Sequence, residues 1–459
     1  MSTVDRSRLP IPGPDREFRF PTIAHRTLGN GLRLRAVRHR SVPIVAMVVL
    51  IPGGSAADPP SAHGLVSMTT GLLDEGSRGQ SALDIADRIA RIGGELELDT
   101  GLDAVTVGLT TLDRFFDAGL ALMRDVIVEP NLANDDFNRI RNLRLERLKQ
   151  MRDHAGALAE RAFAKVIYGD HPYGHLSLGA EESITSMNLD AVRAMHGAMF
   201  TPAGSTLVIV GDRREEELLD HAAAVFESWR ATASPLTIDR EAADAEPPAR
   251  PDVKLGVVHR AAAAQSELRI GHTCARRSTP DYHALLILNT ILGGDFVSRL
   301  NLNLREQKGY TYGVRTGFSL RRGVGPFVTQ TSVGTDVTGA AIQETLAEIA
   351  AIRDARPATA EEVAGAFATM SKGYPRGFET AGQVARAVAQ LALHDLPDTY
   401  FEEFVPRLAQ VTTADITNVA RKYLDPARMT TLIVGDLDKI HESLPALGLG
   451  PHTVLTPTI

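Results

Sequence analysis

The chain has 459 residues, of which 44% are hydrophobic and 23% are charged, and these values are ordinary for a globular protein of two to four domains. Its formal net charge is −7, and the sequence has no basic tract interleaved with aromatic residues, which argues against a nucleic-acid-binding face. The single cysteine, Cys274, excludes an internal disulfide and a paired-cysteine zinc or redox site.

The amino-terminal segment 1–19 does not resemble an export signal. It carries charges and prolines where a signal peptide needs an apolar run of about 7–15 residues. The longest apolar run, Ile44–Pro52, is far shorter than the roughly 20 residues that span a bilayer. We therefore expect a cytoplasmic protein without membrane association, or a periplasmic one if a leader precedes the given sequence.

The predicted elements mix strands with amphipathic helices. In the first half of the chain they are a hairpin around Asn30-Gly31, a strand at 44–51, helices at 64–73 and 82–93, paired strands at 95–100 and 104–110, and helices at 112–127 and 134–151. The second half repeats this order with a strand at 266–273, a helix at 280–294, paired strands at 310–320 and 326–334, and long helices. Hairpins rather than strict strand-helix-strand alternation predict α+β domains, with helices packed on mainly antiparallel sheets.

An internal repeat indicates two similar domains. Residues 187–212 and 411–436 align without a gap at an offset of 224, and both end in Val-Gly-Asp. Between the repeats, 231–252 is rich in Ala, Pro and charge without a sustained period, which is typical of a linker. The expected divisions are an extension at 1–19, a first domain at 20–230, a linker at 231–252, a second domain at 253–445 and a tail at 446–459.

Two segments resemble the pitrilysin and mitochondrial-processing-peptidase family of inverted zincin peptidases. They are ILGGDFVSRLNLNLREQKGYTYGV at 291–314 and DHPYGHLSLG at 170–179, and the repeated helix-turn-strand ending in Val-Gly-Asp fits the same family. The resemblance covers roughly residues 20 to 440. It implies two similar α+β domains that form half of a clam-shell. Two such halves, fused or as separate subunits, enclose a chamber in which peptides are cut.

The resemblance also implies a His-x-x-Glu-His motif on a helix, in which two imidazoles hold Zn²⁺ and the glutamate accepts a proton from water. Spacings of three and four residues put these side chains on one helix face. The flanking pairs Gly64-Leu65 and Gly76-Ser77 match the family pattern and align the five motif positions with Ser67, Met68, Thr69, Thr70 and Gly71. Both histidines and the glutamate are therefore missing, and the sequence predicts no metal site and no cofactor in this chain.

Several other residues along the chain are candidate metal ligands. The downstream zinc ligand of the family should fall near 145–148, where the best register gives Arg147, with Glu146 as its neighbour. One carboxylate cannot hold zinc. His63 precedes the helix without a histidine three or four residues later, which favours a solvated or capping role. His171 and His175 fit a structural turn of the family, and the string starting at His441 has Pro445 where a second histidine is needed.

The second domain keeps a pair of residues that the resemblance makes functional. In the family, an arginine and a tyrosine at the spacing of Arg305 and Tyr312 reach from the second half to the zinc of the first half, where they contact the substrate backbone and the developing oxyanion. Both side chains donate hydrogen bonds to an oxygen whose charge grows in the transition state. Tyr310 competes for the tyrosine role, because alternating positions of a strand share one face.

The segment 93–109 matches the family's substrate-binding edge strand, which implies that Gly94, Glu95 and Leu96 contact a peptide added as an extra strand. The combination of a lost metal motif and a retained Arg/Tyr pair resembles the non-catalytic subunit of a two-subunit peptidase. Its homologous partner would carry His-x-x-Glu-His and the zinc. Two alternatives stay open: a scaffold subunit with this fold and no activity, and a homodimeric peptide-binding protein that captures chains without cutting them.

Overall fold

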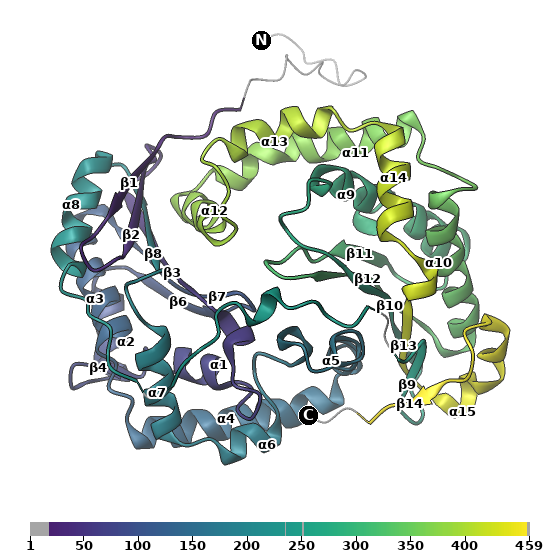
Figure 1. Cartoon of the computed structure of the whole chain (residues 1–459), viewed down its shortest axis with the longest axis horizontal. Coiled ribbons are helices and arrows are strands. Elements are labelled where there is room, and N and C mark those ends of the chain that lie inside the picture. Colours follow the sequence, from purple (N-terminus) through teal and green to yellow (C-terminus); the bar gives the residue numbers. More distant parts are fainter. Residues whose placement is uncertain (1–17, 235, 250–251, 457–459) are drawn as a thin grey trace, which may run out of the picture.

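The structure, a computed structural model, describes residues 18–234, 236–249 and 252–456, and it consists of two six-stranded sheets with helices packed on them (Figure 1). The α+β architecture with two similar domains is therefore confirmed. The predicted absence of an export signal falls mainly on residues 1–17, which lie outside the described residues. No helix in the described ranges is both long and apolar enough to cross a membrane.

The first sheet is built from the amino-terminal half of the chain, and all its neighbouring strands are antiparallel except β2 and β8. In sheet order its strands are β1 (Ile23–Thr27), β2 (Arg33–Arg38), β8 (Thr206–Gly211), β3 (Ile44–Pro52), β7 (Ala104–Leu112) and β6 (Glu95–Thr100). The predicted hairpin at Asn30-Gly31 joins β1 to β2, with Gly31 at a φ of 89° that glycine adopts without strain. Strand β6 has one neighbour, so its outer edge is unpaired.

The second sheet repeats the first. Its order is β11 (Val314–Phe318), β12 (Gly325–Gly334), β10 (Gln265–Ala275), β13 (Thr430–Gly435), β9 (Leu255–His259) and β14 (Thr453–Val454). The parallel pair β9 and β13 corresponds to β2 and β8. Helix α7 (Leu189–Met199) with β8 and helix α14 (Thr413–Tyr423) with β13 keep the same 224-residue offset as in the sequence, which supports the duplication.

The remaining helices surround the sheets, and several begin with reciprocal side-chain caps, as at Ser81 with Asp84 and Thr359 with Glu362. In the first half they are α1 (Leu65–Thr70), α2 (Ala82–Arg91), α3 (Phe116–Val128), α4 (Asn134–Asp153), α5 (Ala155–Tyr168), α6 (Glu181–Ser186) and α8 (Glu215–Phe226). In the second half they are α9 (Tyr282–Asn289), α10 (Thr338–Arg353), α11 (Ala360–Gly373), α12 (Ala381–Leu393), α13 (Tyr400–Ala409) and α15 (Leu437–Ile440).

Two helices cross from one half of the chain to the sheet of the other half. Helix α12 packs on β3 and β8 of the first sheet, and α5 packs on β10 and β13 of the second (Figure 1). All six residues of β8 and of β13 are buried, because each strand is covered on both faces. Each sheet is therefore covered in part by a helix from the other half of the chain.

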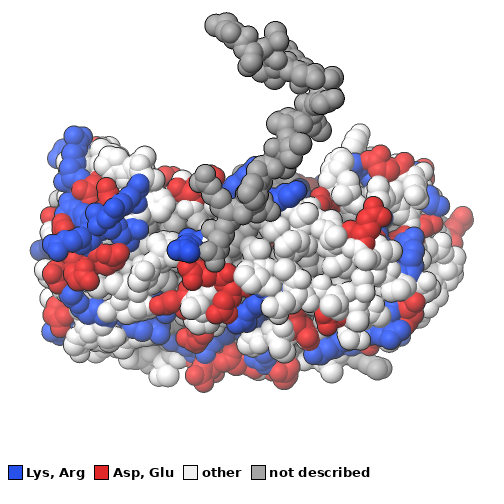
Figure 2. All heavy atoms as spheres, turned by 90° about the horizontal axis from the view of Figure 1, so that it is seen from above, with Lys and Arg blue, Asp and Glu red and all other residues white. Residues whose placement is uncertain are grey.

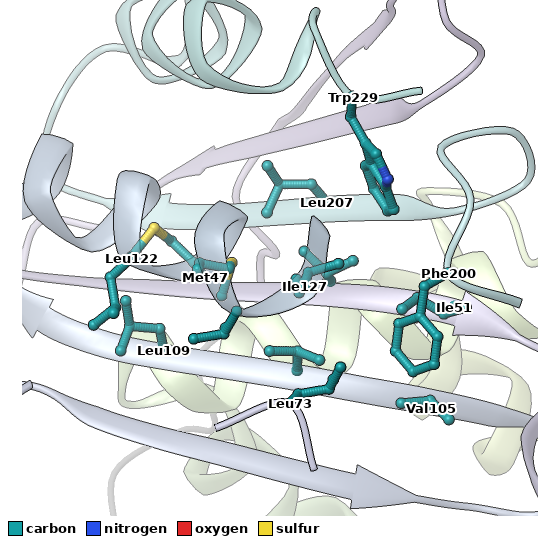
Figure 3. Close-up of a cluster of buried hydrophobic side chains, with 14 of the residues drawn as sticks. Met47, Ile51, Leu73, Val105, Leu109, Leu122, Ile127, Phe200, Leu207 and Trp229 are labelled. Carbon is teal, nitrogen blue, oxygen red and sulfur yellow. The ribbon is translucent and has the colours of Figure 1, made fainter. Parts of the chain in front are cut away.

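The core of the first domain lies between the sheet and helices α1, α3 and α7. Figure 3 shows Met47, Ile51 and Leu109 from the strands against Leu122 and Ile127 of α3. Each of these side chains is at most 1% exposed. Alternation along β7 directs every second residue into this core, as expected for a strand with one face on helices.

Three segments differ from the sequence-based expectations. The predicted helix at 64–73 ends at Thr70, because Gly71 closes it as the C-cap. The helix predicted at 280–294 ends as α9 at Asn289 and continues as a π-helical turn to Gly294. The segment 231–252, predicted as a linker, packs against the first domain where it is described, since Ser234 Oγ donates to Ala194 O at 2.7 Å and Arg240 Nη2 to Met199 O at 2.9 Å.

Charges are mixed over the surface. On the face in Figure 2, acidic and basic side chains are interspersed, with a group of basic residues gathered at one end and no continuous basic band across the molecule.

Candidate functional site

Helix α1 and its C-cap Gly71 carry the three positions that the sequence-based alignment assigns to the zinc-binding and catalytic residues. Its first turn is held by Asp58, whose buried carboxylate accepts hydrogen bonds from Gly64 N at 2.7 Å and Val66 N at 2.8 Å. Gly64 has a φ of 91°, and a Cβ there would lie 2.7 Å from Leu178 O, so only glycine fits. Asp58 was not among the residues predicted from the sequence, although a carboxylate shortly before a helix start is a signal of a helix cap.

Arg144 of α4 fills part of the space beside α1. Its Nη1 donates to Ser67 Oγ at 2.9 Å and its Nη2 to Ser67 O at 2.6 Å. A Cβ built on Gly71 would lie 2.9 Å from Arg144 Nη2, so the guanidinium lies directly against both positions that the family gives to histidine. The third position, Thr70, is buried and its hydroxyl donates to Val66 O at 2.9 Å.

Arg147, the sequence-based candidate for the downstream ligand position, is exposed and lines the same cavity one turn further along α4. The sequence placed the right helix beside α1, but it did not identify Arg144 as the residue that contacts Ser67. Burial, with a smaller contribution from the nearby charge of Arg147, lowers the pKa of the Arg144 guanidinium to about 10. The Arg144 guanidinium remains cationic at neutral pH.

A cavity of about 390 Å³ separates α1 and α4 from the edge strand β6. It is lined by Ser67, Thr70, Gly71, Leu98, Asp99, Thr100, Arg144, Arg147, Met151, Leu176, Ser177 and Leu178. Asp99 is the one zinc-type ligand in this lining, and the two cations would repel a metal ion. The residues present therefore do not fit Zn²⁺ at this place.

The histidines near α1 are held by the fold. His63 stacks on His175 with ring centroids 4.0 Å apart, and His175 Nε2 lies 3.2 Å from Asp58 Oδ2. His171 accepts from Tyr173 N at 3.1 Å through Nδ1, and its Nε2 lies 3.0 Å from Ala245 O. Within the described residues, one cluster brings three metal-type ligands together, namely His259, Asp436 and Asp438 of the second domain. It is remote from α1 (Figure 1).

Arg305 and Tyr312 lie in the second domain between α9 and β11. Arg305 lies in a π-helical turn, η6 (Asn301–Gln307), where its guanidinium stacks over the Phe296 ring at 3.4 Å and its Nε donates to Glu306 Oε1 at 2.8 Å. Tyr312 is 96% exposed. Its side chain has no hydrogen-bond or ring partner in the described parts of the chain.

The expected strand at 310–320 begins at Val314, so Tyr310 and Tyr312 occupy a loop. The prediction that Tyr310 and Tyr312 lie on one face of a strand was therefore wrong. The loop replaces strand pairing with side-chain bonds, since Thr311 Oγ1 donates to Ser332 O at 2.8 Å and lies 2.9 Å from Thr331 Oγ1. Tyr310 is half-buried against the second core, whereas Tyr312 projects from the surface.

The segment that contains this pair also carries exposed apolar side chains. Phe296 is 67% exposed and Val297 66%, and Leu302 is exposed as well. All three lie within the same segment as Arg305 and Tyr312. Monomeric proteins seldom expose several large apolar side chains together, and such groups mark sites of protein association.

The edge strand β6 holds the residues expected to contact a peptide. Glu95 is exposed, Leu96 is half-buried, and Gly94 N donates to Ile89 O at 2.9 Å just before the strand. On its inner side β6 pairs with β7, while its outer edge faces no strand in the described chain. No hydrogen bond, ion pair or ring contact in the described ranges joins α1 or β6 to Arg305 or Tyr312, which belong to the other domain (Figure 1).

Comparison with known proteins places this geometry in one family. The family model described as "Insulinase (Peptidase family M16)" matches residues 35–180, and the model "Peptidase M16 inactive domain" matches residues 186–370. The first match contains β3, β6 and β7 of the first sheet, and the second contains β8 of that sheet and β9 to β12 of the second. Together they identify the class of protein as an M16-type chain. The chain belongs to the peptidase M16 family.

Its relatives include both peptidase-like and non-peptidase proteins. A Streptomyces coelicolor protein named an uncharacterized zinc protease is 23% identical over 434 residues, covering 95% of this chain and 93% of its own. A Helicobacter pylori protein named a non-peptidase homolog is 23% identical, covering 58% of this chain and 60% of its own. A structure described as a peptidase M16 inactive domain, from Pseudomonas fluorescens, superposes with a TM-score of 0.83 at 24% identity, over 90% of this chain and 98% of that one.

Proposed function

We propose that this chain is the non-catalytic subunit of a heteromeric zinc metallopeptidase, and that it supplies Arg305 and Tyr312 to the zinc site of a homologous subunit. The observation that carries the proposal is Tyr312, a phenol that is 96% exposed beside an arginine of the expected spacing. Membership in the M16 family and the absence of zinc ligands on α1 support the same division of labour.

The chemistry of the pair suits hydrolysis of a peptide bond. The guanidinium of Arg305 and the hydroxyl of Tyr312 each donate hydrogen bonds, and a carbonyl oxygen under attack gains negative charge that such donors stabilise. The stack of Arg305 on Phe296 restricts the guanidinium without using all its donors. Metal chemistry would come from the partner subunit, whereas this chain would bind and orient the substrate carbonyl.

The apolar surface beside the pair supports a protein partner. Association with a second M16 chain would cover Phe296, Val297 and Leu302 and would bring Tyr312 from solvent into a site with less water. Hydrogen bonds to a developing oxyanion are stronger where water is excluded. The exposed position of Tyr312 in the single chain is therefore consistent with a residue that acts in a complex.

The test is reconstitution with a homologous subunit that carries His-x-x-Glu-His. We expect peptidase activity in the mixture and none in this chain alone. Arg305→Ala and Tyr312→Phe should each lower kcat by about 10²-fold, the usual cost of losing one oxyanion donor. The complex should form as before, measured by size-exclusion chromatography.

Tyr310→Phe is the matched control, because it removes the same hydroxyl from the same loop at a half-buried position. It should leave turnover unchanged. Equal turnover of Tyr312→Phe and the unmodified pair would remove the proposed role of Tyr312. A stable complex without activity would instead favour a scaffold or peptide-binding function.

A further inference from the structure

Two arginines beside α1 have no acidic partner among the residues that the structure describes. Arg144 bonds to the hydroxyl and carbonyl oxygens of Ser67, and Arg147 lies at the exposed side of the same cavity. Arg139 of the same helix differs in this respect, since it is paired with Glu75 and Asp136. Within the described residues neither arginine makes an ion pair, although Asp99 lines the same cavity.

This arrangement is electrostatically unfavourable unless an anion enters. Taking a guanidinium out of water costs free energy, which a carboxylate partner normally offsets. Burial is also the main cause of the lowered pKa of Arg144; the charge of Arg147 adds to this effect, and the charge of Asp58 opposes it. A planar carboxylate would satisfy free donors of both groups, because guanidinium forks match the two oxygens of a carboxylate.

The cavity lies where an added peptide strand would run. Leu98, Asp99 and Thr100 of β6 form one wall, and α1 and α4 form the others. The outer edge of β6 offers unpaired backbone groups to an extended peptide. A peptide on this edge would pass beside the two guanidinium groups.

We propose that this cavity is a carboxylate-binding site, in which Arg144 and Arg147 hold the carboxylate of a peptide that pairs with β6. The carboxylate comes from the peptide's C-terminus or from an acidic side chain. The site goes beyond the assistance given by Arg305 and Tyr312 and does not depend on it, since it lies in the other domain and needs no partner subunit.

Asp99 sets the strength of the site. It is the one acidic residue in the lining, it is exposed, and it makes no ion pair of 4 Å or less with Arg144 or Arg147 in the described chain. Its charge repels an incoming carboxylate at the mouth of the cavity. Removing that charge should therefore strengthen binding of an anionic peptide.

The experiment measures binding to the full chain by fluorescence anisotropy. The probe is a short peptide of alternating threonine and valine, labelled at its N-terminus and ending in a free carboxylate. We compare it with the same peptide as a C-terminal amide, and with an amide that carries one glutamate in its centre. We expect the peptide acid to bind about tenfold more tightly than the plain amide, as one charge-assisted hydrogen bond allows.

The glutamate-containing amide separates the two sources of the carboxylate. If it matches the peptide acid, the site accepts acidic side chains, and if it matches the plain amide, the site reads the terminus. Arg144→Gln and Arg147→Gln should each remove most of the preference. Arg147 is exposed, so its substitution keeps the fold, and circular dichroism checks Arg144→Gln.

Two further variants sharpen the outcome. Arg141→Gln removes the same charge from α4 outside the cavity lining, and it should leave the tenfold preference intact. Asp99→Asn should raise affinity for the peptide acid about twofold to threefold. Equal binding of acid and amide, absence of binding, or a preference that survives the double substitution of Arg144 and Arg147 would overturn the proposal. None of these results bears on reconstituted peptidase activity, so failure of the two proposals can be distinguished.

Discussion

At the scale of single residues, small residues at positions 67 and 71 leave space for a positively charged side chain, Arg144. Ser67 and Gly71 leave space that the Arg144 guanidinium partly fills. The place of Ser67, Thr70 and Gly71 beside one cavity could be predicted from the sequence, because helical spacing of three and four residues fixes a shared face. The role of Arg144 could not, since Arg144 and Arg147 are one turn apart and only the packing of α4 decides which one reaches Ser67.

Because Arg144 occupies space beside Ser67 and Gly71, restoring the His-x-x-Glu-His motif alone should not create a zinc site. The combined variant Ser67→His, Thr70→Glu and Gly71→His, with Arg144 retained, should hold no stoichiometric zinc. A side chain at position 71 would collide with the guanidinium, and its charge repels Zn²⁺. Adding Arg144→Ala and Arg147→Glu removes both cations and supplies a carboxylate, so about one zinc per chain is expected.

Metal analysis of the dialysed proteins measures this difference, with the unmodified chain as the zinc-free reference. A full equivalent of zinc in the variant that retains Arg144 would show that the guanidinium does not block the site.

At the scale of elements, hydrophobic periodicity was sufficient to place most helices and strands, because the side chains that alternate or recur every three to four residues are those that meet the core. It failed at 310–313, where alternating Tyr and Thr favour a strand but Thr311 bonds hold a loop. It also could not show that α12 covers the sheet of the other half, since an apolar helix face does not specify which sheet it packs on.

The crossing of α12 gives a stability prediction. Leu391 is fully buried in a cluster that joins α12 to Val208 and Val210 of β8. Leu391→Ala should lower the free energy of unfolding by about 2–5 kcal/mol, because it leaves a cavity between the two halves. Arg386→Ala on the same helix is the control, since its contact with Glu97 is exposed and 3.9 Å long, and it should change stability by about 0.5 kcal/mol or less.

Urea unfolding followed by circular dichroism measures both variants. A loss below about 1 kcal/mol for Leu391→Ala would mean that α12 does not hold the first sheet in solution.

At the scale of the whole molecule, the two halves depend on one another. Each domain has its own core, and helix α12 packs on the first sheet while α5 packs on the second, so two further buried clusters join the halves. These crossing helices hold α1 and β6 of the first domain in place relative to η6 of the second, which carries Arg305. It also places the Arg/Tyr pair and the α1 cavity in different domains, which is consistent with two separate tasks.

Two buried and two half-buried histidines predict that the whole fold weakens in mild acid. Burial lowers the pKa of His283 and of His394 from 6.5 to about 4, and it lowers the pKa of His196 and His272 as well. Below pH 6.5 the unfolded chain binds protons that the folded chain does not. Stability is therefore fully present above about pH 6.5 and is lost progressively as the pH falls toward about 4.

The midpoint of thermal unfolding between pH 7.5 and 4.5 tests this expectation. His283→Phe should flatten the dependence on pH, because it removes a histidine whose buried Nε2 has no hydrogen-bond partner in the described structure and leaves an aromatic ring to pack against Phe404. His452→Gln is the control, since His452 is exposed and its removal should leave the slope unchanged. If His283→Phe shows the same slope as the unmodified chain, acid weakening arises from other groups, and protonation of His283 does not contribute to it.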